Sequence, residues 1–277
     1  MLPTYTAVRY ITPLREGGSL PAIVETEEGG MFATKFRGAG QGARALIAEL
    51  IVGGIATALG FDIPDVALID LDEAFGRSER DPEIQELLRA SHGTNVGLRY
   101  LPGSLNYDPV ALPDINPSLA ADIIWLDALT TNIDRTPRNP NMMVWEGKLW
   151  LIDHGAALYF HHNWTGLDDA RIMAPFPQIK DHVLLPAAGD ILESDARLSP
   201  LVSDELMLSI LDAIPDQLLM DCPAGTEPAF PTAGENRAAY RDYFARRLAG
   251  PRQFAAEAAG AAELRRSQPQ ERQSYRR

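Results

Sequence analysis

The sequence Met31-Phe32-Ala33-Thr34-Lys35-Phe36 is an apolar, strand-like run that carries a lysine near its end. Lysine is rare in this chain, which has three lysines and 22 arginines. The following stretch, residues 36–61, holds a single carboxylate, Glu49, in an apolar run with helical spacing. A lone acid on an apolar helix face needs a buried cation as its partner. The sequence therefore predicts that Lys35 and Glu49 pair.

A β-rich part surrounds this run. We expect strands at residues 5–13, 21–26, 31–36 and 66–71, a helix at about 43–59, helical spacing within 73–91, and a short strand in 97–103. Glycines between the first three strands supply the positive φ angles of tight hairpins, so these strands are predicted to form a meander. The breaker Pro102-Gly103 marks the expected end of the first lobe.

The pattern beyond that point is mainly helical. Apolar residues from Leu119 to Leu129 repeat at three and four positions, and Ser118 is the expected N-cap. A polar loop, two short strands at 142–145 and 148–152, and helices near 204–213 and 236–248 follow. The expected fold is therefore α+β and bilobal. We place the first lobe at 1–102, the helical lobe at 103–250, and a helical end with a disordered basic tail, beginning at Leu264, within 251–277.

Composition limits the function classes. A length of 277 residues allows one large domain or two lobes, and the net charge of −13 argues against broad nucleic-acid binding. No run approaches the ~18 apolar residues of a membrane span. The single Cys222 excludes an internal disulfide and agrees with a reducing compartment. We expect a cytoplasmic protein that contacts neither nucleic acid nor membrane.

Three polar residues after the long helix carry the chemistry. Asp134 is followed five residues later by Asn139, and Asp153 follows the second short strand. In phosphoryl transfer one carboxylate orients the attacking hydroxyl, while an amide oxygen and a second carboxylate hold the magnesium ions that bridge the phosphates. The hairpin between Asn139 and Asp153 would fold the chain back so that the two meet. Asn141 is an alternative to Asn139, because both flank Pro140.

A glycine-rich turn occupies the place of a phosphate-covering loop. Gly17, Gly18 and Ser19 lie between the first two expected strands, where backbone N–H groups could approach an anion. Any hairpin turn uses glycine in the same way, so both readings stay open.

Taken together, these motifs resemble the HipA-like kinase family. The match follows Arg15-Glu16-Gly17-Gly18-Ser19-Leu20-Pro21, Thr34-Lys35-Phe36, Asn132-Ile133-Asp134-Arg135 with Asn139, and Ile152-Asp153-His154-Gly155 in order and spacing. Two positions depart from related patterns: Thr136-Pro137 stands where many such proteins have histidine, and His154 stands where protein kinases have phenylalanine. We expect no counterpart of the extra N-terminal domain of toxin members, so no toxin role is carried over.

The resemblance implies a kinase fold, related to phosphatidylinositol kinases and protein kinases, that binds ATP and Mg²⁺ between its lobes. Asp134 would be the catalytic aspartate and Asn139 and Asp153 the metal ligands. Lys35, paired with Glu49, would bind the phosphates. The hinge, including Leu98, Tyr100 and Leu101, would meet adenine. The γ-phosphoryl group would pass to a hydroxyl, with serine or threonine of a protein as one class of acceptor.

Three other functions compete with this reading. The chain could be a kinase-like module that binds nucleotide and transfers nothing, or a nucleotidyl transferase on the same fold. A metal hydrolase would use His154, His161 and His162 with Asp168 and Asp169, but adjacent histidines point in different directions on a strand or a helix. We interpret these histidines as part of a segment that borders the substrate site, and we expect substrate specificity to come from residues 160–190.

Overall fold

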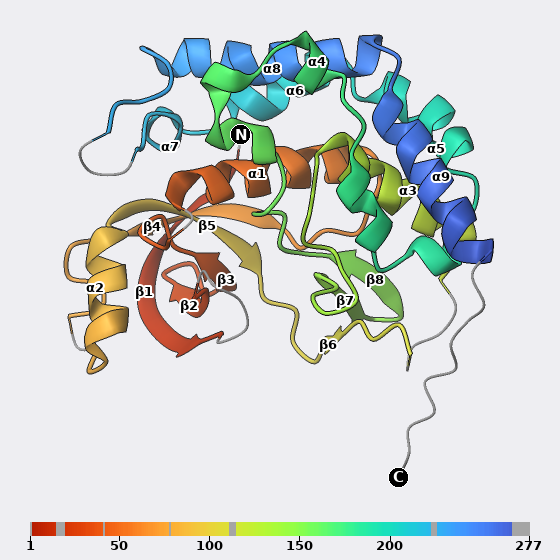
Figure 1. Cartoon of the computed structure of the whole chain (residues 1–277). Helices are drawn as coiled ribbons and strands as arrows, with labels where there is room; N and C mark the ends of the chain where they lie inside the picture. Colours follow the sequence, from red (N-terminus) through yellow and green to blue (C-terminus); the bar gives the residue numbers. More distant parts are fainter. Residues whose placement is uncertain are drawn as a thin grey trace.

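The computed structural model describes residues 2–14, 20–40, 42–77, 79–110, 115–222 and 226–267. A closed five-stranded barrel forms the N-terminal part, and a mainly helical part follows it (Figure 1). The α+β organisation predicted from the sequence is confirmed. No helix in these ranges combines the length and the apolar character needed to cross a membrane.

The barrel is built from the first hundred residues. Its elements are β1 (Thr4–Pro13), β2 (Ala22–Thr26), β3 (Met31–Lys35), α1 (Gly42–Ala58), β4 (Val66–Leu71), α2 (Pro82–Ala90) and β5 (Gly93–Arg99). The strand order is β1-β2-β3-β5-β4, so the predicted meander of the first three strands is present. Residues 4–6 of β1 pair in parallel with residues 68–70 of β4, which closes the barrel. Antiparallel pairing of β3 with β5 sets Lys35 opposite Val96.

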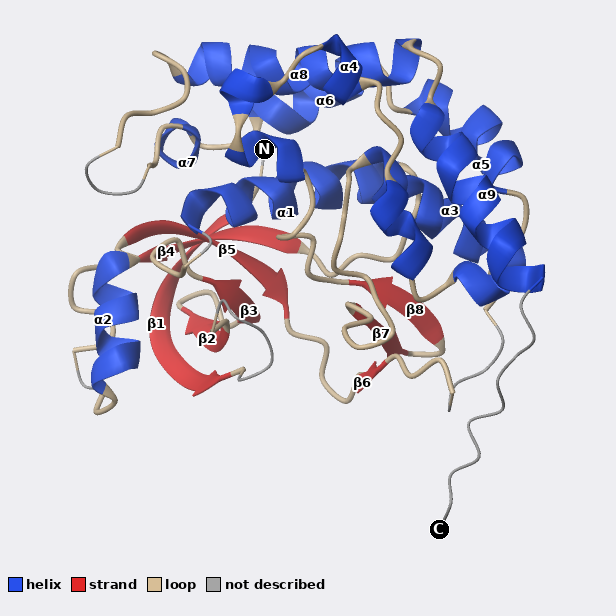
Figure 2. Ribbon diagram, in the orientation of Figure 1, coloured by secondary structure: helices blue, strands red, loops and turns tan. Residues whose placement is uncertain are grey.

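The helical part contains a second small sheet. Its elements are β6 (Leu105–Asn106), α3 (Pro117–Leu129), β7 (Met142–Trp145), β8 (Lys148–Leu151), α4 (Asp169–Ile172), α5 (Ile191–Leu198), α6 (Asp204–Asp212), α7 (Asp216–Leu219), α8 (Ala233–Ala249) and α9 (Gln253–Ser267). Short 3-10 helices are η1 (Tyr159–His162), η2 (Trp164–Gly166), η3 (Pro177–Asp181), η4 (Leu185–Ala187) and η5 (Ser199–Leu201). Strands β6, β7 and β8 pair antiparallel beside the barrel (Figure 2).

The described residues form two hydrophobic cores, and α1 belongs to the larger one. Val24, Phe32 and Ile69 lie in the small core inside the barrel. Leu68 of β4 and Val96 of β5 point the other way, because successive strand residues alternate between faces, and they join the core of the helical part. Helix α1 joins the same core and contacts α6 and α7, so it runs between the barrel and the helical part (Figure 1).

Two local predictions are corrected by the structure. The N-cap of α3 is Asn116, whose side chain accepts from Ser118 N at 2.9 Å, rather than Ser118 itself. Pro117 then occupies the first helical position, where its missing N–H is not needed. The tail expected to be disordered from Leu264 is helical as far as Ser267, because α9 continues to that residue. Residues 268–277 lie outside the described ranges.

Candidate active site

Lys35 lies between two carboxylates that come from different parts of the molecule. Its Nζ is 2.5 Å from Glu49 Oε2 of α1 and 2.5 Å from Asp153 Oδ1, which follows β8. Lys35 is 7% exposed and Glu49 1% exposed, so the pair is buried. The end of a barrel strand, the middle of α1 and the residues after β8 therefore meet at one amine.

The charges at this point are mutually dependent. Burial lowers the pKa of Lys35, but the two carboxylates outweigh burial and raise that pKa above its ordinary value. Burial likewise raises the pKa of Asp153, but the Lys35 ammonium outweighs it and leaves that pKa lowered. Lys35 is consequently a fixed cation and Asp153 a fixed anion at neutral pH.

Glu49 also holds the backbone that follows Asp153. Its Oε2 accepts a hydrogen bond from the backbone N–H of His154 at 2.8 Å. Asp153 itself has a φ of 55°, a left-handed conformation that aspartate and asparagine adopt more readily than most residues. A Cβ on Gly155 would come to 3.4 Å from both Lys35 Nζ and Ala45 Cβ, which is ordinary van der Waals contact, so this turn passes close to the amine.

Asp134 is half-buried and is held by two amides. Its Oδ2 accepts from Asn139 Nδ2 at 2.7 Å and from Asn141 Nδ2 at 3.2 Å. Burial raises the pKa of Asp134, and the negative charge of Asp153 raises it further. The negative charges of Asp134 and Asp153 therefore repel each other, and Lys35 forms an ion pair with Asp153. The structure brings Asp134, Asn139, Asn141, Asp153 and Lys35 into one region.

The loop that begins at Asp134 is a compact turn. The backbone N–H of Thr136 donates to the carbonyls of Asp134 (2.9 Å) and Asn139 (3.1 Å), and Asn139 N donates back to Thr136 O at 3.1 Å. This turn returns Asn139 to the carboxylate of Asp134. Thr136 thus has a structural part in the loop at the position where the sequence departs from related patterns.

The β7–β8 hairpin sets the distance between the loop and Asp153. Met142 pairs with Leu151, and Ile152 N donates to Asn141 O at 3.0 Å. Asn141 is therefore directly across from the residue before Asp153. Asn139 is exposed and Asn141 is 8% exposed, and both amides contact Asp134. The choice between them as metal ligand stays a prediction.

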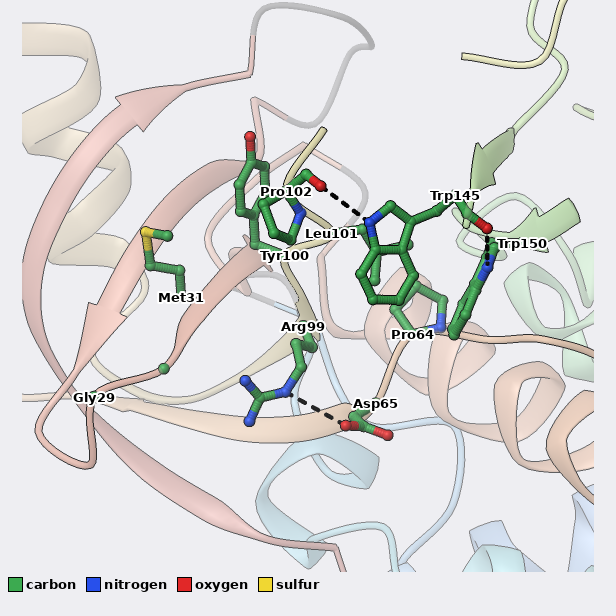
Figure 3. Close-up of a pocket in the computed structure, with 11 residues that line it drawn as sticks. Gly29, Met31, Pro64, Asp65, Arg99, Tyr100, Leu101, Pro102, Trp145 and Trp150 are labelled. Carbon is green, nitrogen blue, oxygen red and sulfur yellow. Dashed lines mark hydrogen bonds and ion pairs between the residues drawn. The ribbon is translucent and has the colours of Figure 1, made fainter. Parts of the chain in front are cut away.

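The predicted hinge lies beside a surface pocket of about 440 Å³ (Figure 3). Leu98 and Leu101 are buried, whereas Tyr100 is 38% exposed and its N–H donates to Met31 O at 2.9 Å. Tyr100 and Leu101 line this pocket together with Trp145 and Trp150. Lys35, Asp134 and Asp153 do not line it, so the pocket is separate from the charged group described above.

Other predicted residues are placed as follows. Gly17, Gly18 and Ser19 lie outside the described ranges. His161 is fully buried and its Nδ1 lies 2.9 Å from the hydroxyl of Tyr240. His154 Nδ1 lies instead 3.3 Å from Arg135 Nη2. The described residues contain no group of three or more His, Cys, Asp or Glu side chains that could hold a metal ion, so the arrangement expected of a hydrolase does not form among them.

Sequence reasoning missed a second buried charge cluster beneath the loop. Asp127 of α3 is fully buried and its Oδ2 is 2.5 Å from Arg135 Nε and 2.9 Å from His182 Nε2. The signal was present in the sequence, because Asp127 is the single acid of the apolar run from Ile123 to Leu129. The lone-acid argument that pointed to Glu49 applies equally to Asp127.

Comparison with known proteins decides the family. The model of the HipA-like kinase family matches residues 7–182, which is more than half of the chain. The chain belongs to the HipA-like kinase family. The resemblance drawn from the sequence motifs is therefore confirmed, and a kinase-like, nucleotide-binding function follows from membership of this family.

Among solved structures, this HipA-like kinase is similar to the Helicobacter pylori proinflammatory kinase CtkA. The TM-score is 0.58 at 12% sequence identity, and the match covers 95% of this chain and 98% of the CtkA chain. At this identity the likeness shows the fold alone, and it confirms the bilobal kinase fold. No curated protein matched the sequence.

Proposed function

We propose that this HipA-like kinase binds ATP with Mg²⁺ where the barrel meets the helical part and transfers the γ-phosphoryl group to a hydroxyl acceptor. One observation carries the proposal: Lys35 Nζ lies 2.5 Å from both Glu49 and Asp153. A strand lysine fixed by a helix glutamate, next to a carboxylate after a hairpin, is the arrangement with which kinases hold a triphosphate and its metal.

The residues supply binding, positioning and charge. Lys35, which its two carboxylate partners keep charged, would bind phosphate oxygens. Glu49 would hold the Lys35 side chain extended toward those oxygens. Asp134 would accept a hydrogen bond from the acceptor hydroxyl and orient the hydroxyl oxygen toward the phosphorus. Its contribution would come mainly from positioning the reactants and from electrostatic stabilisation. The raised pKa of Asp134 makes its carboxylate a better proton acceptor than an ordinary aspartate.

The donors near Lys35 fit magnesium. Mg²⁺ prefers oxygen ligands and is usually held by one or two carboxylates together with substrate phosphates. The Asp153 side chain is 38% exposed. The Asn139 side chain donates to Asp134 through Nδ2, which leaves its amide oxygen as an acceptor. Asp153 and Asn139 would therefore hold the ion, which when bound neutralises charge on the phosphates.

Nucleotide binding is tested by thermal unfolding with and without ATP and MgCl₂. We expect ATP with Mg²⁺ to raise the melting temperature of the wild-type protein and to have little effect on Lys35→Met. Lys148→Met is a matched control, because Lys148 is an exposed lysine whose ion pair, with Asp62, does not include Glu49 or Asp153. The proposal is wrong if the wild type shows no nucleotide-dependent shift.

Transfer is tested with labelled ATP. Label from the γ position should appear on the protein itself or on components of a cell extract, and Asp134→Asn should abolish it. Label from the α position would instead indicate nucleotidyl transfer. Binding of ATP with no transfer of either label would favour the non-catalytic module. Mass spectrometry of the labelled products would then identify the acceptor.

A further inference from the structure

Asp127 is a buried carboxylate with every oxygen in use. Oδ1 accepts from Asn132 Nδ2 at 3.0 Å, and Oδ2 accepts from Arg135 Nε at 2.5 Å and from His182 Nε2 at 2.9 Å. All four side chains are buried. Burial raises the pKa of Asp127, but Arg135 and His182 outweigh it and hold that pKa well below its ordinary value. Asp127 is therefore a permanent anion that joins three segments.

The protonation of His182 follows from its hydrogen bonds. The backbone N–H of Leu184 donates to His182 Nδ1 at 3.1 Å, so Nδ1 carries no proton. The single proton of the neutral ring must then be on Nε2, from which it points at Asp127. Burial lowers the pKa of His182, which agrees with a neutral ring of this tautomer. His182 is thus a fixed donor to Asp127.

Arg135 transmits the position of Asp127 to the candidate catalytic loop. Besides Asp127, its guanidinium donates through Nη1 to Asn141 O at 2.5 Å and reaches His154 Nδ1 at 3.3 Å through Nη2. Arg135 directly follows Asp134, and the Asn141 amide donates to Asp134. The Arg135 side chain therefore joins the residue directly after Asp134 to the backbone of Asn141, whose amide contacts the carboxylate that would orient the acceptor.

The same cluster is tied to the segment that follows Asp153. His182 directly follows η3, and Val183 N donates to Arg135 O at 3.0 Å. The loop at Asp134 and the segment 177–185 thus meet in two places, once through Asp127 and once through the backbone. Neither contact involves Lys35 or Glu49.

We propose that His182 is a positioning residue that couples the segment 177–185 to Asp134 through Asp127 and Arg135. The inference rests on the proposed function, because it gives the segment 160–190 control over the geometry of phosphoryl transfer. A displacement of about 1 Å in a positioned catalytic group can lower a rate on the order of 10²-fold. Nucleotide affinity should not change, since the phosphate-binding lysine lies outside the cluster.

Two substitutions at one position separate the two hydrogen bonds of His182. In His182→Gln the amide Nε2 reaches as far as the imidazole Nε2 and can donate to Asp127, whereas the shorter amide of His182→Asn can accept from Leu184 N but does not reach Asp127. We expect His182→Gln to retain most of the rate of Mg²⁺-dependent ATP hydrolysis or self-labelling. His182→Asn should lower kcat on the order of 10²-fold with KM for ATP unchanged.

A control and a second variant guard against loss of folding. Asn236 is buried and donates to Leu219 O at 2.7 Å, outside the cluster, so Asn236→Ala should lower stability without lowering kcat. Arg135→Lys keeps the charge opposite Asp127 but cannot supply the same fork of donors. If His182→Asn does not fold, Arg135→Lys should show the loss of kcat instead. The proposal is overturned if folded His182→Asn and Arg135→Lys have the same kcat as the wild type. It is also overturned if Asn236→Ala lowers kcat to the same extent.

If the wild type transfers no phosphoryl group, the proposed function is wrong, but the coupling between His182 and Asp134 can still be tested by spectroscopy. In ¹⁵N-labelled protein, the side-chain amide signals of Asn139 and Asn141 report their bonds to Asp134. We expect these signals to move in His182→Asn and to keep their wild-type positions in His182→Gln. Unchanged signals in both variants overturn the coupling.

Discussion

Helices α1 and α3 each bury one carboxylate in an apolar run, but the two carboxylates are satisfied differently. Asp127 of α3 receives hydrogen bonds on both oxygens from three side chains. Glu49 of α1 receives Lys35 and the His154 N–H on Oε2, while its Oε1 has no hydrogen-bond partner within the described residues. The cation of Glu49 is also shared with Asp153, whose side chain is 38% exposed.

This difference separates a structural centre, at Asp127, from the proposed ATP site at Glu49. Around Asp127 every charge has a buried partner, so a ligand has no group to engage. At the proposed ATP site, the lysine shared by Glu49 and Asp153 would be able to exchange the Asp153 carboxylate for a phosphate oxygen and still keep Glu49 as its buried partner. An incompletely satisfied buried charge is therefore the better indicator of a binding site, in keeping with the tendency of perturbed groups to gather at functional sites.

The largest expected effect comes from a substitution in the fully paired Asp127 cluster. Asp127→Asn leaves Arg135 as a buried charge without its counter-ion, and removal of one partner of a buried pair lowers stability by about 3–5 kcal/mol. Denaturant unfolding measures this loss. Asp62→Asn, which removes the partner of Lys148 at the surface, should change stability by less than about 1 kcal/mol. Similar values for the two variants would show that the Asp127 cluster is not a structural centre.

The next effect acts on the exposed partner of Lys35. Asp153→Asn should lower phosphoryl transfer on the order of 10²–10³-fold, because it removes a charge that acts on the reacting phosphates. It should also abolish the Mg²⁺-dependent part of the ATP-induced rise in melting temperature. Calorimetry with ATP alone should still detect binding. A full Mg²⁺-dependent shift in this variant would contradict the assignment of Asp153 as a metal ligand.

Glu49→Gln sharpens the comparison with Asp127→Asn, since both remove one buried negative charge from a helix. Lys35 retains Asp153 in the first variant, so we expect a smaller loss of stability, about 1–3 kcal/mol. The readout that distinguishes them is nucleotide affinity. Isothermal titration should show weaker ATP binding for Glu49→Gln and unchanged binding for the folded fraction of Asp127→Asn. Unchanged ATP binding in Glu49→Gln together with weaker binding in Asp127→Asn would instead place Asp127, and not Glu49, at the nucleotide site.

The smallest effect, taken per pH unit, is a pH dependence of stability that comes from buried neutral histidines. Burial lowers the pKa of His154 to about 4, from 6.5 in the unfolded chain. Between these values the unfolded chain binds more protons, so stability falls as the pH is lowered from about 6.5 toward 4, by at most about 1.4 kcal/mol per pH unit for each such group. His154→Gln should flatten this slope in denaturant titrations. An unchanged slope would assign the dependence to His161 and His182, whose pKa values are also lowered.

Local sequence pattern predicted most of the barrel and the members of the charged group. Strands β1 to β4 and helix α1 begin and end within about one residue of their expected bounds, because glycine turns and apolar alternation are local signals. The parallel pairing of β1 with β4 was not predicted, since it joins residues more than 60 positions apart. The roles of Lys35, Asp134 and Asp153 in catalysis stay predictions.

The Asp127 cluster shows what local pattern cannot supply. Its acid was visible as a lone charge in an apolar helix. Arg135 lies in the polar loop that follows this helix, and His182 is separated from Asp127 by that loop, a hairpin and several short helices. His182 carries no local signal, because a histidine next to a 3-10 helix is unremarkable in sequence. Only the folded chain shows that Leu184 fixes its tautomer.

The place of α1 in the larger core bears on how the chain is made. The barrel strands are all synthesised once residue 99 has left the ribosome, but α1 packs on α6 and α7, which end at Asp212 and Leu219. Helix α1, whose Leu46, Leu50 and Ile51 belong to this core, therefore lacks its α6 and α7 neighbours while more than a hundred further residues emerge. Because transiently exposed apolar surface makes incomplete folds prone to aggregate, we expect a fragment that ends near residue 102 to aggregate.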